Sequence, residues 1–195
     1  SNSIPTKIKL TNITKIATKN NTSAAIDGNG NLYTWGYNSY GQQGISIDNI
    51  YTPRKVPTLE QIIDVAVENN TIIVLDKKGE VLSSGYNGYG NLGNNATQTR
   101  KSFDKVIEKY ETITTGEGEE AQPTTTPIYL SGVKSIQAGN EFAVAIKEDG
   151  TAISWGYNGY SQSSNGTTTN NLLPVTLKYS QDKDQIDKII SVSAG

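Results

Sequence analysis

The chain has 195 residues, of which 18% are charged, and its formal net charge is −2 at pH 7. It contains neither cysteine nor histidine, which excludes disulfides, thiol nucleophiles and Cys-ligated zinc and removes the commonest metal ligand and general base. The near-neutral charge without a long basic run argues against direct binding of nucleic acid. No run of about 18 apolar residues is present to insert into a membrane.

Residues 4–10, which include Pro5, are predicted to be a short strand, the last one of a preceding repeat. A longer unit follows at about residues 13–58. It starts with a short apolar run at 13–18 and continues with a hairpin, TSAAIDGNGNLYTW, whose turn ends in Gly30. A glycine-rich loop, TWGYNSYGQQG, comes next. A last short run contains Pro53.

This unit returns twice, at about residues 62–131 and 133–178. The hairpin turn glycines are separated by 49 and 71 residues, and the first glycines of the three loops have the same two separations. The turn glycines are Gly30, Gly79 and Gly150, and the loop glycines are Gly36, Gly85 and Gly156. Four strands in a unit of about 50 residues is typical of a β-propeller blade. We therefore predict an all-β protein with about three four-stranded blades.

A proline precedes the last run of each unit, at Pro53, Pro127 and Pro174. Proline lacks the N–H that a central strand needs, so this position is predicted to start an outer strand. The stretch from Gly93 to Pro127 is 34 residues long, against 9 residues from Gly44 to Pro53. We place an insertion at residues 104–126. Its first part, KVIEKYETI, could form one or two helical turns, and the rest favours disorder or an extended arm.

The run WGYNSYGQQG, preceded by its hairpin and by an Ala-Gly step such as Ala138-Gly139, resembles the repeat of the RCC1 (regulator of chromosome condensation) family. The resemblance implies a propeller that usually has seven blades, so these three are expected to form an incomplete ring within a larger protein. Residues 186–195 resemble the start of a further repeat. Open faces on the end blades would favour homo-oligomerisation of this piece.

Two departures from the family pattern lead to expectations. Ser84 replaces the tryptophan of the second copy, which predicts looser packing there. Ser161 and Ser164 replace both loop glycines of the third copy, so that loop is expected to be distorted. Trp35 and Trp155 are predicted to lie in the core between blades.

The candidate binding residues are the Tyr and Asn side chains that recur in the three loops. They are Tyr37, Asn38, Tyr40, Tyr86, Asn87, Tyr89, Tyr157, Asn158 and Tyr160. Tyr and Asn in rigid loops give large contact area and adaptable hydrogen bonds, as in antibody binding surfaces. A structural interpretation stays open, because in the family the asparagine holds its own loop and the second tyrosine packs beneath it.

Carboxylates give weaker signals. Asp27-Gly28-Asn29-Gly30-Asn31 has the alternate-oxygen spacing of a calcium loop, but no Glu stands at the twelfth position. We interpret it as a hairpin turn and predict no metal and no cofactor. Glu117, Glu119 and Glu120 are interpreted as a solvated loop rather than an acid/base site.

These features favour a non-catalytic protein–protein interaction module within a larger bacterial protein, secreted or at the cell surface. The protein partner is unknown. Two alternatives remain: a guanine-nucleotide exchange regulator of a small GTPase, as the resemblance implies for the name-giving members, and a propeller protein that acts on carbohydrate.

Overall fold

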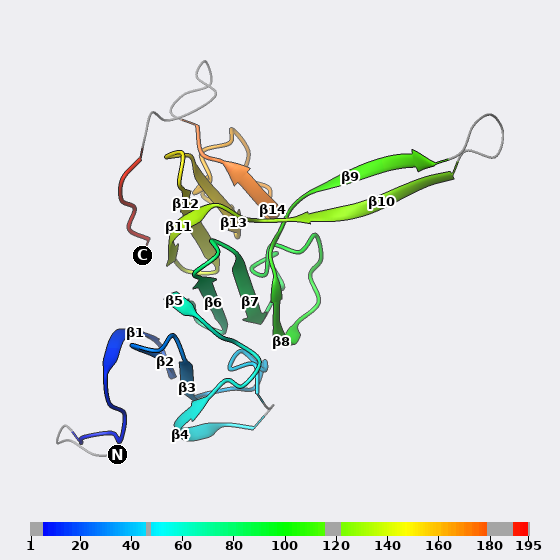
Figure 1. Cartoon of the computed structure of the whole chain (residues 1–195). Helices are drawn as coiled ribbons and strands as arrows, with labels where there is room; N and C mark the ends of the chain where they lie inside the picture. The colour runs from blue at the N-terminus through cyan, green and yellow to red at the C-terminus, as the bar shows by residue number, and fades with distance from the viewer. Residues whose placement is uncertain (1–5, 46–47, 116–121, 179–188, 195) are drawn as a thin grey trace.

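The computed structural model describes residues 6–45, 48–115, 122–178 and 189–194 (Figure 1). Three four-stranded antiparallel sheets and one two-stranded hairpin make up the described chain. Blade 1 contains β1 (Ile13–Lys19), β2 (Thr22–Asp27), β3 (Leu32–Gly36) and β4 (Ile50–Lys55). Blade 2 contains β5 (Ile62–Val67), β6 (Thr71–Asp76), β7 (Val81–Gly85) and β8 (Arg100–Lys105). Blade 3 contains β11 (Val133–Ala138), β12 (Phe142–Lys147), β13 (Ala152–Gly156) and β14 (Asn171–Thr176). The separate hairpin consists of β9 (Ile107–Thr115) and β10 (Gln122–Tyr129).

Each blade is a meander in which neighbours in sequence pair in space. The tight turns between the second and third strands explain the recurring glycines, because Gly30, Gly79 and Gly150 have φ values of 76°, 79° and 90°. Residues with a Cβ adopt this left-handed region only at a steric cost. The all-β, multi-blade fold predicted from the repeats is therefore confirmed, and the blades do not close a ring.

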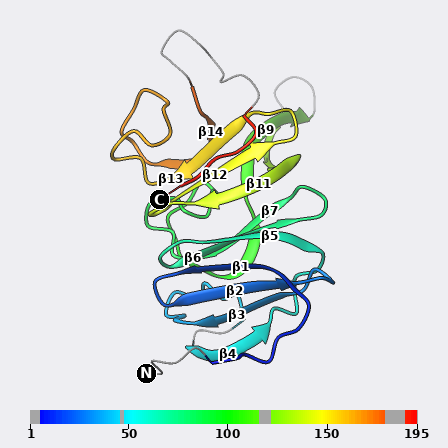
Figure 2. The same cartoon turned by 90° about the vertical axis from the view of Figure 1, so that its left-hand side faces the viewer.

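The blades follow one another in chain order, and β5 contacts both β1 and β11 (Figure 2). Blade 2 is consequently covered on both faces. Ile72 and Val74 of β6 belong to the apolar core shared with blade 1, whereas Ile73 and Leu75 belong to the core shared with blade 3. Successive side chains of a strand point to opposite faces, so a strand buried on both sides has a continuous apolar sequence.

The last strand of blade 2 is not where the proline pattern placed it. The fourth strand is β8, in which Asp104 pairs with Ser83 of β7, and it contains no proline. Pro127 instead lies in β10, opposite Tyr110 of β9. A proline is tolerated in an outer strand but is not needed to form one, so its position was a poor guide to this strand.

The insertion therefore follows the fourth strand and forms the hairpin β9–β10, which extends away from the blades (Figure 1). The helical alternative for its first part is wrong, because Ile107–Thr115 is a strand, and the described residues of its second part are extended. Contacts at its base include the Ile107 N–H, which donates to the Gly93 carbonyl at 2.9 Å. In addition, Lys147 Nζ lies 2.7 Å from Glu108 Oε1, and Lys105 Nζ lies 5.6 Å from the ring centre of Tyr129. The residues Glu117, Glu119 and Glu120 lie outside the described part of the chain.

The ends of the chain carry no assigned strand within the described residues. Residues 6–10 and 189–194 are both without one. The Ile189 N–H nevertheless donates to the Gly150 carbonyl, the bond that Ile62 and Val133 make at the starts of their blades. The repeat boundaries proposed from the sequence stay predictions. The described residues contain no helix that is long and apolar enough to cross a membrane.

Candidate functional site

The meander brings two kinds of segment to the same end of each blade: the turn between the first two strands and the loop between the last two. Backbone hydrogen bonds tie them together. The N–H groups of Tyr37, Tyr86 and Tyr157 donate to the carbonyls of Asn21, Asn70 and Glu141, at distances of 2.7, 2.9 and 2.8 Å. We call this side of the molecule the loop end.

Six tyrosines form an unbroken row across the loop end, with each ring edge-on to the next. The ring centres are 6.4 Å apart for Tyr37–Tyr40, 5.3 Å for Tyr40–Tyr86, 6.0 Å for Tyr86–Tyr89, 5.1 Å for Tyr89–Tyr157 and 6.0 Å for Tyr157–Tyr160. Edge-to-face pairs at these separations are favourable by about 0.5–1.5 kcal/mol beyond burial. We call this set the tyrosine row.

The row crosses both blade junctions, and its shortest contacts are the two that do so. The second tyrosine of one loop packs against the first tyrosine of the next blade, not beneath its own loop as the structural interpretation held. Exposure follows from this arrangement. Tyr160 has no described following blade and is 85% exposed, whereas Tyr89 meets Tyr157 and is 37% exposed.

The first tyrosines fold back over their own loops. A Cβ at Gly88 would lie 2.0 Å from the Tyr86 hydroxyl, and a Cβ at Gly159 would lie 2.3 Å from that of Tyr157. Burial raises the pKa of Tyr86, so its hydroxyl keeps its proton at neutral pH. Blade 1 has Ser39 at the position equivalent to Gly88.

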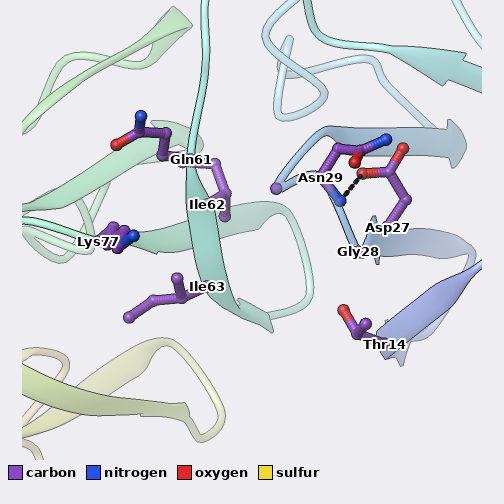
Figure 3. A pocket seen from close by; sticks show the side chains of 9 residues that line it. Thr14, Asp27, Gly28, Asn29, Gln61, Ile62, Ile63 and Lys77 are labelled. Carbon is purple, nitrogen blue, oxygen red and sulfur yellow. Dashed lines mark hydrogen bonds between the residues drawn. The ribbon is translucent and has the colours of Figure 1, made fainter.

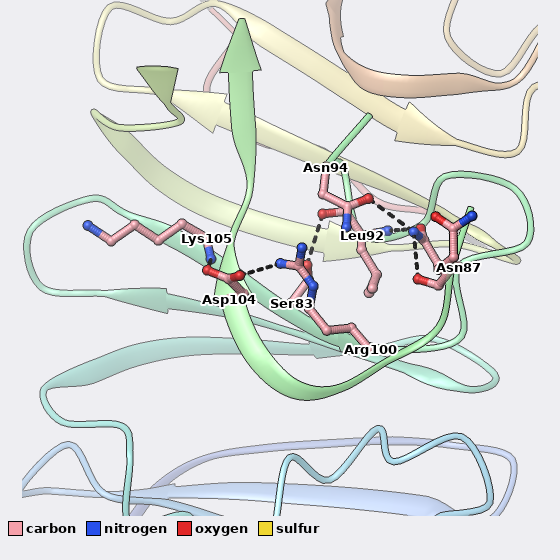
Figure 4. A network of polar contacts seen from close by, with 8 residues as sticks. Ser83, Asn87, Leu92, Asn94, Arg100, Asp104 and Lys105 are labelled. Atoms are coloured by element: carbon pink, nitrogen blue, oxygen red, sulfur yellow. Dashed lines mark hydrogen bonds and ion pairs between the residues drawn. The ribbon is translucent and has the colours of Figure 1, made fainter. Parts of the chain in front are cut away.

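The three predicted asparagines are fully buried. In each loop the asparagine Oδ1 accepts the N–H five residues on, and its Nδ2 donates to backbone carbonyls of the same loop. In blade 2, Asn87 Oδ1 accepts from the Leu92 N–H at 2.9 Å (Figure 4). Its Nδ2 donates to the carbonyls of Ala96 and Gln98. Their enclosed side chains hold the loops, so partner contact through Asn38, Asn87 and Asn158 is not available in this structure.

The third loop is not distorted by its two serines. Ser161 and Ser164 adopt φ values of 60° and 46°, in the region taken by Gly41 and Gly44 of blade 1. The backbone bonds are also the same: Ser161 N–H to Asn158 O at 2.9 Å matches Gly41 N–H to Asn38 O at 2.8 Å. The loop keeps its path and accepts left-handed serines at a cost of about 1–2 kcal/mol each.

The three blades differ at the position of the repeat that is Trp35, Ser84 or Trp155. Trp155 is fully buried, as predicted, and its Nε1–H donates to the Asn91 carbonyl at 2.9 Å. Ser84 is also fully buried and donates from Oγ to the Gln42 carbonyl at 2.6 Å, so the looser packing expected there is not observed. Trp35 is only partly buried, because no described blade precedes it.

A second polar line, which was not predicted from the sequence, runs along the turns of the first two strands. Asn20 Nδ2 donates to Asn69 Oδ1 at 2.8 Å, and Asn69 Nδ2 donates to Asn140 Oδ1 at 2.5 Å. These residues are separated by 49 and 71, the same spacings as the turn glycines. The repeat alignment could therefore have found them.

Next to this line, two carboxylates share one amide. Asn91 Nδ2 lies 3.0 Å from Glu68 Oε2 and 2.8 Å from Glu141 Oε2. Glu68 is fully buried, and within the described residues its Oε1 has no hydrogen-bond partner. Burial raises the pKa of Glu68 to about 8; Asn91 lowers it, Glu141 raises it further, and Lys19 lowers it.

The opposite end of the blades has a hollow of about 410 Å³ between the turns of blades 1 and 2 (Figure 3). The buried carboxylate in its lining, that of Asp27, is fully hydrogen-bonded within its own hairpin. Asp27 accepts hydrogen bonds from the Asn29 and Asn31 N–H groups, the Asn31 amide and the Tyr33 hydroxyl. Mainly the Asn31 side-chain bond lowers the pKa of Asp27. This carboxylate stabilises a hairpin turn, so the loop end is the stronger candidate site.

Comparison with known proteins defines the class. Two profiles of the regulator of chromosome condensation (RCC1) repeat match the chain, one over residues 13–42 and 133–162 and the other over residues 29–74. Together with the blade architecture, they identify a β-propeller segment. The chain therefore contains RCC1 repeats within residues 13–74 and 133–162. A search of curated proteins found no match.

Solved structures agree on the fold. The chain is similar to Prp20p from Saccharomyces cerevisiae, with 21% identity and a TM-score of 0.68 over 96% of this chain and 42% of that one. Yeast RCC1 (Prp20) bound to Kap60 has 20% sequence identity and a TM-score of 0.63, over 87% of this chain and 38% of that one. Human WBSCR16 has 16% sequence identity and a TM-score of 0.50, over 94% of this chain and 56% of that one. The chain thus spans less than half of the Prp20 structures, and identities this low show the fold alone.

Proposed function

We propose that this RCC1-like propeller segment is a non-catalytic module that binds a protein partner through the tyrosine row. The observation that carries the proposal is the row itself, because it runs unbroken over three blades and stays partly exposed even at a blade junction, where Tyr89 is 37% exposed. Tyrosine supplies wide contact area at low cost in conformational entropy.

The loops around the row support this assignment. The segments 37–45, 86–99 and 157–170 contain no Asp, Glu, Lys or Arg, although such residues are 18% of the chain. They consist mostly of Tyr, Asn, Gln, Ser, Thr and Gly, the composition of adaptable binding loops. The buried asparagines hold these loops in fixed shapes, which lowers the entropy lost on binding.

The proposed setting is a larger bacterial protein that is exported. It rests on the composition, which lacks cysteine and is rich in Asn, Ile, Lys, Thr and Tyr. The yeast protein Prp20p has binding properties toward Gsp1p and histones. This chain has no basic run to suit a chromatin partner, so that activity is not part of the proposal.

Substitution of exposed tyrosines tests the proposal. The intact parent protein is used to capture a partner, and the dissociation constant is measured for the wild type, for Tyr89→Ala and for Tyr160→Ala. Each variant should weaken binding at least tenfold, because large aromatic side chains dominate interface energies. Tyr110→Ala is the matched control, since Tyr110 is 40% exposed, close to the 37% of Tyr89, but lies on β9 of the arm, away from the tyrosine row. Equal binding by all four proteins would refute the role of the row.

A further inference from the structure

The junction between blades 1 and 2 contains a hollow of about 230 Å³ at the loop end. It is lined by Asn20, Asn21, Tyr37, Asn69 and Asn70. The hollow could hold roughly seven water molecules at about 30 Å³ each, which is comparable to one sugar ring with its hydroxyl groups. Its walls thus combine four amide side chains and one aromatic ring.

Two of the amides are available to a ligand. Within the described residues, the side chains of Asn21 and Asn70 make no hydrogen bond, although their backbone carbonyls hold Tyr37 and Tyr86. An amide offers two donors and an acceptor with two lone pairs. The neighbouring pair, Asn20 and Asn69, is already joined by a 2.8 Å bond, which fixes one wall.

The equivalent place between blades 2 and 3 is bridged by a side chain instead. Glu141 stands where blade 2 has Asn70. Its Oε1 accepts from Asn69 Nδ2 at 3.1 Å, and its Oε2 accepts from Asn91 Nδ2 at 2.8 Å. The open amides of the first junction are therefore a property of that junction and not of every repeat.

The residues around the hollow favour a ligand without charge. All five lining residues are uncharged, and the loops beside them lack charged residues. The nearest cation in sequence, Lys19, is directed to the Gly139 carbonyl at 3.0 Å. The carboxylate of Glu141, which contacts the lining residue Asn69, already accepts from the amides of Asn69 and Asn91. A charged ligand would therefore lose hydration without gaining an uncommitted counter-charge, and an apolar ligand would leave the amides unsatisfied.

We propose that this hollow binds one unit of a neutral sugar. The amides of Asn21 and Asn70 would exchange hydrogen bonds with neighbouring ring hydroxyls, because each amide can donate and accept at once. Tyr37 would contact the C–H groups of the ring. Tyr37 has one described ring neighbour, Tyr40, so a face of its ring is free of aromatic contact. Tyr37 is shared with the tyrosine row, whereas Asn21 and Asn70 lie outside it, so the experiments below rest on these two asparagines.

Side-chain amide signals give a direct test. The ¹⁵N-labelled protein is titrated with the methyl glycosides of glucose, galactose, mannose and N-acetylglucosamine. At least one sugar should shift the signals of Asn21 and Asn70 with a millimolar dissociation constant, which corresponds to about −4 kcal/mol. No shift at these amides with any of the four sugars would overturn the proposal, whatever the tyrosine variants show.

Variants then locate the site. Asn70→Ala should weaken sugar binding at least tenfold, and Asn70→Glu should abolish it by placing the bridging side chain of the second junction in the first. Asn29→Ala is the control, because Asn29 is an exposed asparagine at the opposite end of blade 1. Sugar binding that survives Asn70→Glu would contradict the assignment.

The biological source of the sugar is a separate measurement. A glycoprotein with neutral glycans is compared before and after enzymatic removal of its glycans, alongside a soluble neutral polysaccharide. Binding of the glycoprotein that is lost on glycan removal identifies a protein-borne glycan, whereas binding of the polysaccharide alone identifies a free polymer. Failure of both to compete with the methyl glycoside would refute the site.

Discussion

The two blade junctions use equivalent positions in different ways. Between blades 2 and 3, Trp155 fills the interface and Glu141 bridges the loop end. Between blades 1 and 2 the equivalent residues are Ser84 and Asn70, and a hollow remains at the loop end. One feature is shared: Trp155 and Ser84 each donate a hydrogen bond to a carbonyl of the preceding blade, that of Asn91 or Gln42.

This difference shows which part of the repeat is obligatory. The hydrogen bond from this side chain to a backbone carbonyl of the preceding blade is kept even though the indole is replaced by a hydroxymethyl group. The missing volume is supplied by another side chain: Gln42 is fully buried, and its Cβ would lie 2.7 Å from a Cβ at Gly85. Its Nε2 also donates to Thr22 Oγ1 at 3.3 Å. A polar side chain thus packs one junction and an aromatic one packs the other.

The largest expected effect is that of Trp155→Ala. Loss of a fully buried Trp typically costs about 3–5 kcal/mol, and the Asn91 carbonyl would also lose its donor. Ser84→Ala removes only a hydroxyl and should cost about 1–2 kcal/mol. Urea denaturation of the two variants and the wild type measures both free energies of unfolding.

Trp35→Ala is the second comparison for that experiment. Trp35 is chemically identical but only partly buried, so its replacement should cost less than half as much as that of Trp155. Equal losses at Trp35 and Trp155 would contradict the assignment of the second junction as the one that depends on the indole.

The next effect depends on pH and concerns Glu68. The pKa of this group is raised from its usual 4.5 to about 8 in the folded protein. The folded state therefore holds a proton between these values that the unfolded state has released, and stability falls as the pH rises through this window. The slope cannot exceed about 1.4 kcal/mol per pH unit for one group. The charged groups that face Glu68 are Glu141 and Lys19.

Glu68→Gln replaces the titratable carboxyl group with an amide of nearly the same size and shape. Melting temperatures measured from pH 5 to 9 should fall with pH in the wild type and stay nearly constant in the variant, so that the difference is largest at pH 9. Glu148→Gln is the control, because Glu148 is an exposed carboxylate of blade 3. Parallel curves for the wild type and Glu68→Gln would show that Glu68 is ionised in the folded protein.

The blades were predictable because their signals are local and repeated. A turn glycine at Gly30, Gly79 and Gly150, with one spacing for turns and loops, fixes the strand order without knowledge of any distant contact. The tyrosines of the candidate site were found for the same reason. Their ring-to-ring contacts could not be predicted, because Tyr40–Tyr86 and Tyr89–Tyr157 depend on how adjacent blades dock.

Errors arose where a residue type was given one structural meaning. Pro127 was treated as the start of an outer strand, but the pairing of β8 with β7 does not require proline. Ser161 and Ser164 were expected to distort a loop, yet the buried Asn158 holds that loop in shape and the serines follow it. The asparagines are a contrast, because the family resemblance implied that each holds its own loop, and the buried Asn38, Asn87 and Asn158 do so.

The smallest effect is expected for removal of the arm, the β9–β10 hairpin. The arm is the largest difference in chain length between the two junctions. The chain passes from Val56 to Leu59 through two residues, Pro57 and Thr58, and from Val106 to Leu130 through residues 107–129. The Leu59 N–H donates to the Val56 carbonyl at 3.4 Å, and the Leu130 N–H donates to that of Val106 at 2.9 Å. A two-residue crossing therefore fits the same frame, and replacement of residues 107–129 by Pro-Thr should leave the chain folded and lower the free energy of unfolding by about 2 kcal/mol at most. The lost contacts are the partly exposed pair Lys147–Glu108, the contact of Lys105 with Tyr129, and the buried Ile107, whose N–H donates to the Gly93 carbonyl. Ion pairs near the surface are worth little, and the replacing proline keeps part of the apolar burial that Ile107 provides. Chemical denaturation and the near-ultraviolet signal of Trp155 measure this, and unfolding of the shortened chain would show that the arm is needed to join blades 2 and 3.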